Sequence, residues 1–133
     1  MYDKLIAFKL KRPTYLSIKM NNLNTPIFLP DLKINHGTHK SICLHEVIML
    51  RGEVNYTTFC MKNGREIMIA HTLKYFEDKL NEFGFMRVHR AFLVNPKYII
   101  NYDSVEHKIE MDCNLIAQVS RRRIKEFNDY WDA

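Results

Sequence analysis

The sequence predicts a mainly β fold with two helices, arranged as short antiparallel sheets with the second helix at the C-terminus. Short apolar and β-branched runs alternate with turn residues over most of the chain, which is typical of antiparallel sheets. The dipeptide Asn63-Gly64 between two such runs is the strongest local signal for a β-hairpin. Two segments with apolar residues at helical spacing interrupt the strands.

The strands are expected to follow one another along the chain as hairpins. They cover residues 33–35, 40–44, 47–51, 56–61, 65–70, 86–90, 98–102, 108–111 and 115–119. Turn residues separate them, most clearly at His36-Gly37, at Asn63-Gly64 and at Asp112-Cys113-Asn114.

Each expected helix has a start signal and one apolar face. Thr72 can cap the first helix, and Gly84 stands where a terminating glycine belongs. Between them the apolar positions are Leu73, Phe76, Leu80 and Phe83. Ser120 can cap the second helix, whose apolar face consists of Ile124, Phe127 and Trp131.

The chain of 133 residues has the length of one domain with a short extension. We place the domain at residues 33–133 and a basic N-terminal extension at residues 1–32, which holds five basic residues against two aspartates. Prolines and an asparagine-rich run make this extension compatible with loose order, with a short strand at residues 15–19.

The formal net charge of +5 favours polyanionic partners such as nucleic acid or an acidic membrane surface. No stretch approaches the roughly 20 apolar residues of a membrane span, and the N-terminal residues make a poor signal peptide. Three cysteines without a CxxC pair argue against a disulfide framework. We therefore expect a cytoplasmic protein with no membrane partner.

The expected second helix opens with three arginines, Arg121, Arg122 and Arg123. Cations in a first helical turn face the positive end of the helix dipole, at a cost of about 0.3–1 kcal/mol each. An anion bound there would remove the conflict, since Ser120, the first backbone N–H groups and the guanidinium groups would form a phosphate site. Three solvated surface arginines, tolerated at small cost, explain the pattern equally well.

The expected strand at residues 86–90 adds a second cationic element. Strand alternation places Arg87 and His89 on the face opposite Met86 and Val88. Arg90 would then face the apolar side, so we expect the chain to turn there and to project Arg90 outward. For His89, a packed and hydrogen-bonded imidazole is favoured over a base contact, and both readings stay open.

The loop that ends in Asn55 and Tyr56 is a third candidate. Asn can pair bidentately with adenine in the major groove, and Tyr can stack or reach a phosphate. An ordinary hairpin turn explains the same residues.

Four segments occur in an order that resembles the LytTR-type DNA-binding domain of bacterial transcription regulators. They are a strand, loop and strand at residues 47–56, the helix start Thr72-Leu73, the run Phe85-Met86-Arg87-Val88-His89-Arg90-Ala91-Phe92-Leu93-Val94-Asn95, and Val119-Ser120-Arg121-Arg122. The resemblance covers about residues 42–127. It departs at Arg51, where many family members carry an acidic residue.

The resemblance implies a fold in which loops, rather than a recognition helix, enter successive major grooves and the minor groove between them. By position, the base-reading residues would be Asn55, Tyr56, Arg90 and Arg122. Residues that mostly hold phosphates would be Arg87, Ser120, Arg121, Arg123 and Lys125. His89 remains a further DNA-binding candidate. Arg122 suits a base contact because its planar fork can take guanine O6 and N7 together.

We therefore expect sequence-specific binding of double-stranded DNA by a small bacterial transcription regulator. The resemblance also implies a homodimer on direct repeats. Family members usually carry a receiver domain or membrane helices, for which residues 1–32 are too short. We expect no control by a fused receiver, and the regulating signal or partner stays open.

Three other classes were weighed against DNA binding. A metal site at His36, His39, Cys43 and His45 is disfavoured because the spacing differs from usual zinc patterns. An enzyme is disfavoured because the sequence has no recognisable nucleophile turn or phosphate-binding glycine loop, so no catalytic residue or cofactor is expected. A protein–protein adaptor or anti-regulator on the same scaffold, which uses the basic surface to hold an acidic partner or caps another regulator, remains the main alternative.

Overall fold

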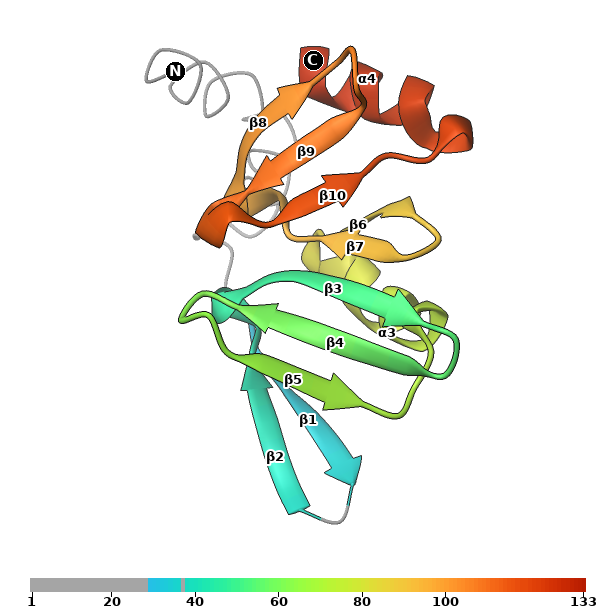
Figure 1. The fold of residues 1–133 in the computed structure, drawn as a ribbon. Coiled ribbons are helices and arrows are strands. Elements are labelled where there is room, and N and C mark those ends of the chain that lie inside the picture. The colour runs from blue at the N-terminus through green and yellow to red at the C-terminus, as the bar shows by residue number, and fades with distance from the viewer. Residues whose placement is uncertain (1–28, 37) are drawn as a thin grey trace.

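The computed structural model describes residues 29–36 and 38–133 (Figure 1). Most of the expected extension, including its strand at residues 15–19, lies outside the described residues. The strands are β1 (Asp31–His36), β2 (Thr38–Cys43), β3 (Val47–Glu53), β4 (Tyr56–Met61), β5 (Glu66–Ile69), β6 (Met86–His89), β7 (Phe92–Val94), β8 (Ile99–Asp103), β9 (Lys108–Met111) and β10 (Ile116–Gln118).

In the described part of the chain, two α-helices and several short 3₁₀ turns accompany the strands. The helices are α3 (Leu73–Leu80) and α4 (Ile124–Asp132), and the 3₁₀ turns are η1 (Leu44–Glu46), η2 (Asn81–Phe83), η3 (Pro96–Tyr98), η4 (Asp112–Asn114) and η5 (Arg121–Arg123). The prediction of a mainly β fold with two helices, one of them C-terminal, is confirmed.

Within the described residues the strands form three antiparallel sheets. The central sheet has five strands in the order β5-β4-β3-β7-β6, and β3 lies between its own hairpin partner β4 and the later strand β7. A second sheet has the order β10-β9-β8, and β1 pairs with β2 alone. The hairpin predicted at Asn63-Gly64 joins β4 to β5, and Gly64 adopts the positive φ of 84° that such a turn requires.

Apolar side chains cover both faces of the central sheet, as strand alternation demands. On one face Leu50, Phe59 and Leu93 pack against the buried face of α3. On the other face Met49 and Val94 join the second sheet and α4. The central sheet is therefore buried between α3 on one side and the β8–β10 sheet with α4 on the other (Figure 1). This packing fixes the strand ends from which the loops project.

The first predicted helix is confirmed, including its cap, because the Thr72 hydroxyl accepts a hydrogen bond from the Tyr75 N–H at 3.3 Å. The α-helix ends at Leu80, and η2 carries the chain on to Gly84, whose φ is 94°.

The start predicted for the second helix is wrong in detail. The three arginines form the separate turn η5, and α4 begins only at Ile124. Ser120 stands before η5, but its side chain makes no capping hydrogen bond. Its backbone N–H donates instead to the Val88 carbonyl of β6 at 2.8 Å, so a tertiary contact sets the conformation here. The three arginines thus form a 3₁₀ turn that runs directly into the first turn of α4.

Candidate nucleic-acid interface

Three connecting segments lie along one edge of the molecule, the right-hand edge in Figure 1. They are the β3–β4 turn, the β6–β7 turn at Arg90 and Ala91, and η5. The Gly52 N–H of β3 donates to the Ala91 carbonyl at 2.8 Å, and the Ser120 N–H donates to the Val88 carbonyl. The β6–β7 turn is therefore hydrogen-bonded to β3 on one side, while β6 is bonded to the start of η5 on the other.

A glycine is required where β3 passes under the start of α3. A Cβ atom on Gly52 would lie 2.8 Å from the Cβ of Leu73, closer than real contacts allow. The absent side chain lets α3 pack on the sheet and keeps its first turn near the edge that carries the three segments.

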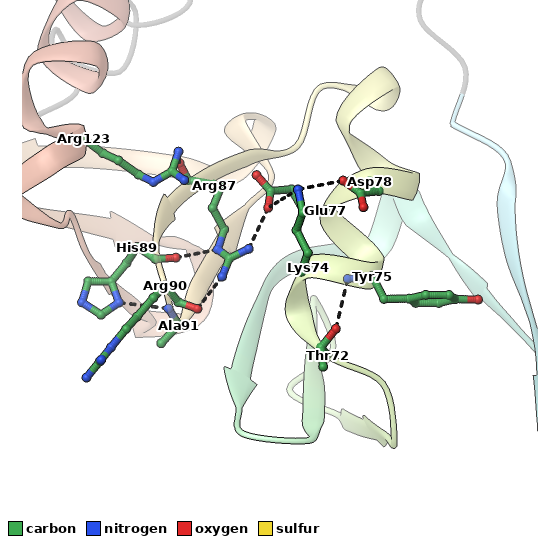
Figure 2. Close-up of polar contacts among 10 residues, drawn as sticks. All are labelled: Thr72, Lys74, Tyr75, Glu77, Asp78, Arg87, His89, Arg90, Ala91 and Arg123. Carbon is green, nitrogen blue, oxygen red and sulfur yellow. Dashed lines mark hydrogen bonds and ion pairs between the residues drawn. The ribbon is translucent and has the colours of Figure 1, made fainter.

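Arg87 fills the space inside the β6–β7 turn (Figure 2). Its Nε donates to the His89 carbonyl at 2.7 Å, and its Nη2 donates to the Arg90 carbonyl at 2.6 Å. Its Nη1 forms a 2.8 Å ion pair with Glu77 of α3. Only 13% of the Arg87 side chain is exposed, whereas Arg90 is exposed and its side chain points away from the turn.

His89 also binds the turn from within. Its Nδ1 accepts a hydrogen bond from the Ala91 N–H at 3.0 Å. A nitrogen that accepts a hydrogen bond carries no proton, so the imidazole ring is neutral. Burial, followed by the charges of Arg90 and Arg87, lowers the pKa of His89 below its usual value. The packed, hydrogen-bonded reading of His89 thus describes its position in the structure.

A groove of about 570 Å³ lies between the β6–β7 turn, η5 and α3. It is lined by Lys74, Glu77, Arg87, His89, Arg90, Ser120, Arg121, Arg122 and Arg123, and we call it the cationic groove. Six of these side chains are cationic and one is a carboxylate, so the groove attracts anions. Arg121 and Arg122 are exposed, while Arg123 Nη1 donates to the Arg87 carbonyl at 3.2 Å.

Residues 38–132 match the family model of the LytTr DNA-binding domain. The chain belongs to this family. A solved structure of a LytTr DNA-binding domain from Bacillus cereus has the same fold, with a TM-score of 0.62 at 20% sequence identity, over 77% of this chain and 97% of that one. No curated protein matches the sequence. Membership of the LytTr family supports DNA as the partner and transcription regulation as the role.

The structure brings most of the predicted residues to one edge of this LytTr domain. Arg87, His89, Arg90, Ser120, Arg121, Arg122 and Arg123 all line the cationic groove. Asn55 and Tyr56 lie on the neighbouring β3–β4 turn and outside the groove lining; Asn55 is exposed and Tyr56 is 49% exposed. Lys125 lies on α4, also outside the lining, and pairs with Asp129 at 3.2 Å.

For two residues of the LytTr domain, Lys74 and Arg51, the structure shows a position or a contact that the sequence did not reveal. Lys74 lines the cationic groove from the first turn of α3, and its side chain is 70% exposed. Its position directly after the Thr72-Leu73 helix start was an available signal. Arg51 stands where the sequence departs from the family pattern. It forms an ion pair with Glu66 of β5 at 2.9 Å, so this basic side chain is held by a residue of the same sheet.

No group of three potential metal ligands occurs among the residues that the structure describes. His36 and His39, two of the four residues weighed as ligands, fall where side chains are not described. Over the same described part of the chain, no helix has the length and apolar character to cross a membrane.

Proposed function

We propose that this LytTr domain binds a specific duplex DNA sequence and regulates transcription by reading bases with three loops. Asn55 and Tyr56 on the β3–β4 turn, Arg90 on the β6–β7 turn and Arg122 on η5 are the base-reading residues. The sugar-phosphate backbone of the DNA is held by Arg121, Arg123, Ser120 and Lys125. The observation that carries the proposal is the cationic groove, which the β6–β7 turn and η5 line at the edge that also carries the β3–β4 turn.

The division of roles follows from exposure and geometry. Arg90 and Arg122 are exposed, and an arginine fork can donate to guanine O6 and N7 together. Lys125 is a point charge on a side chain that is 90% exposed, which suits a phosphate contact. Two copies on adjacent direct repeats would present two such edges to the same face of the DNA.

The first experiment selects bound duplexes from a random library at roughly physiological salt. A repeated enriched motif supports the proposal and gives the spacing of the copies. Weak, salt-sensitive binding without an enriched motif supports instead the adaptor function on the same scaffold.

The Arg122→Ala variant then tests base reading on the selected site. We expect a loss of about 1–3 kcal/mol in binding and relaxed discrimination at one base pair, because a bidentate contact is removed. Titrations against the best site and its single-base variants measure both. Unchanged affinity for the best site would contradict the role of Arg122.

The Lys125→Ala variant is the matched comparison, since it removes one cation from the neighbouring helix α4. We expect binding to weaken by a similar factor on every sequence and the slope of log K against log salt to fall by about one unit, because one phosphate contact is lost. The measurement is the same titration at several salt concentrations. A sequence-dependent loss would move Lys125 into the base-reading group.

A further inference from the structure

The hydrogen bonds and the ion pair of the Arg87 guanidinium all have their partners within the protein. Nε and Nη2 bind two successive carbonyls, those of His89 and Arg90, and Nη1 binds the Glu77 carboxylate. With 13% of its side chain exposed, Arg87 presents little surface to a ligand. Its position in the sequence suggested a phosphate contact, but its contacts join the turn to α3.

Glu77 is the carboxylate in the otherwise cationic groove, and 23% of its side chain is exposed. It repels a DNA phosphate, so a groove built only for charge would gain from its absence. It does hold Arg87 at 2.8 Å, and it comes from α3, whose other face is buried against the central sheet. The ion pair therefore connects the rigid core to the β6–β7 turn.

The turn needs such a connection because the ladder is irregular there. The pairing of β6 with β7 shifts register between Arg87 and His89, which leaves the backbone at Arg90 outside the regular hydrogen-bond pattern. Arg87 binds two successive carbonyls at this irregularity, those of His89 and Arg90, while the Ala91 carbonyl accepts from Gly52. A planar guanidinium can hold both carbonyls and a carboxylate at once, which a lysine ammonium on its flexible stem cannot do in the same fixed geometry.

We propose that Arg87 is a positioning residue for base recognition. Fixed by Glu77, it holds the β6–β7 turn in the conformation that directs Arg90 toward the DNA. Arg87 acts through Arg90, and the phosphate contact belongs to other residues of the cationic groove. The inference rests on the proposed function, because it requires Arg90 to read a base.

The test is a double-mutant cycle on the selected DNA site with Arg87→Ala, Arg90→Ala and the combined variant. We expect Arg90→Ala to reduce discrimination at one base pair by about 5- to 150-fold, the range for a lost bidentate contact. Arg87→Ala should relax the same base pair. In the Arg90→Ala background, Arg87→Ala should change neither the discrimination nor the salt slope.

A phosphate-binding Arg87 gives a different pattern. It would lower the salt slope by about 0.9 in both backgrounds and weaken all sequences alike, which would overturn the inference. Arg65→Ala is the matched control for the loss of one arginine, because Arg65 lies in the β4–β5 turn at the opposite end of the sheet (Figure 1). It should leave discrimination unchanged.

Glu77→Gln provides a milder variant whose two effects have opposite signs. Removal of the carboxylate makes the groove more cationic, so affinity for unrelated DNA should rise. If Glu77 positions the turn through Arg87, discrimination at the base pair assigned to Arg90 should fall at the same time. Stronger binding with unchanged discrimination would overturn the inference.

Folding of each variant is checked by thermal unfolding, and Arg87→Lys replaces Arg87→Ala if the latter unfolds. Arg87→Lys keeps the charge, so a loss of discrimination with an unchanged salt slope would support positioning by the guanidinium. Full discrimination in Arg90→Ala would overturn both the proposed function of Arg90 and this inference. Relaxation in Arg90→Ala but not in Arg87→Ala or Arg87→Lys would overturn the inference alone.

Discussion

The β6–β7 turn and the β3–β4 turn lie along the same edge, and a hydrogen bond from Gly52 near the end of β3 to Ala91 ties the β6–β7 turn to β3, yet the two turns are held differently. In the β6–β7 turn, Arg87 and His89 bind the backbone of Arg90 and Ala91 from within. The β3–β4 turn is held by strand pairing, with Glu53 opposite Tyr56, and its tip at Val54 is 89% exposed.

The difference bears on the base contacts proposed above, because it gives two ways of presenting a side chain to DNA. A turn that is already fixed loses little conformational entropy when DNA binds, so its contacts contribute more of their energy to affinity and specificity. A turn held only by its strands can adjust to local DNA shape, at the expense of ordering on binding. We therefore expect the β6–β7 turn to dominate discrimination and the β3–β4 turn to tune it.

The largest expected effect comes from Gly52, where β3 is bonded to the β6–β7 turn and passes close to α3. In Gly52→Ala the new Cβ atom would lie 2.8 Å from the Leu73 Cβ, so the strand or the start of α3 has to shift. We expect a loss of about 1–3 kcal/mol in the free energy of unfolding, as for other overpacked sites. Denaturant unfolding measures it.

Glu53→Ala is the control, because Glu53 is the next residue of β3 and its side chain is exposed. A change within about 0.5 kcal/mol is expected there. If Gly52→Ala is equally mild, α3 is free to shift on the sheet, and its packing on β3 is less tight than the contact indicates.

The second prediction compares the two turns directly in DNA binding. Tyr56→Ala should cost less discrimination than Arg90→Ala, because Tyr56 is the first residue of β4, beside a turn to which no side chain of the described residues is seen to hydrogen-bond, whereas Arg87 holds the β6–β7 turn. We expect about 1–3 kcal/mol for Arg90→Ala at one base pair and less than about 1 kcal/mol for Tyr56→Ala. Titration of the selected site and its single-base variants gives both values. A larger loss in Tyr56→Ala would reverse the assignment of the dominant turn.

The features that the sequence predicted correctly depend on residues that are close together in the chain. Asn63-Gly64 forms its hairpin because Gly64 supplies a positive φ, and Thr72 caps α3 through a residue three positions later. Arg90 turns outward because β6 ends at His89, where the pairing with β7 shifts register. In each case neighbours in the sequence determine the conformation.

The parts that sequence reasoning missed depend on contacts between distant segments. The ion pair of Arg87 with Glu77 joins a strand to a helix, and no periodicity indicates which arginine of a cationic strand will fold back. The 3₁₀ turn η5 follows from the bond between Ser120 and Val88, which the apparent helix start did not reveal. The family resemblance predicted which sequence positions would face DNA. The ion-pair and hydrogen-bond partners of these residues within the protein are seen only in the structure.

The smallest predicted effect is a pH dependence of the β6–β7 turn, which distinguishes it from the β3–β4 turn. The pKa of His89 is lowered in the fold, mainly by burial and then by Arg90 and Arg87, so the unfolded chain takes up the proton first as the pH falls. The stability that neutral His89 contributes is therefore present above the usual histidine pKa of about 6.5, and is lost as the pH falls from there through the lowered pKa.

Amide hydrogen exchange locates this effect in the β6–β7 turn. Protonation removes the acceptor at Nδ1, so the protection of the Ala91 amide, corrected for intrinsic exchange, should fall as the pH decreases below about 6.5 through the lowered pKa of His89. The Gly64 amide, which donates to the Met61 carbonyl at 3.0 Å in the β4–β5 turn, serves as the reference. In His89→Asn an amide oxygen can accept the same bond but does not titrate, so the pH dependence at Ala91 should disappear. If it persists in His89→Asn, another group controls the turn, and the internal support that distinguishes it from the β3–β4 turn does not depend on the charge of His89.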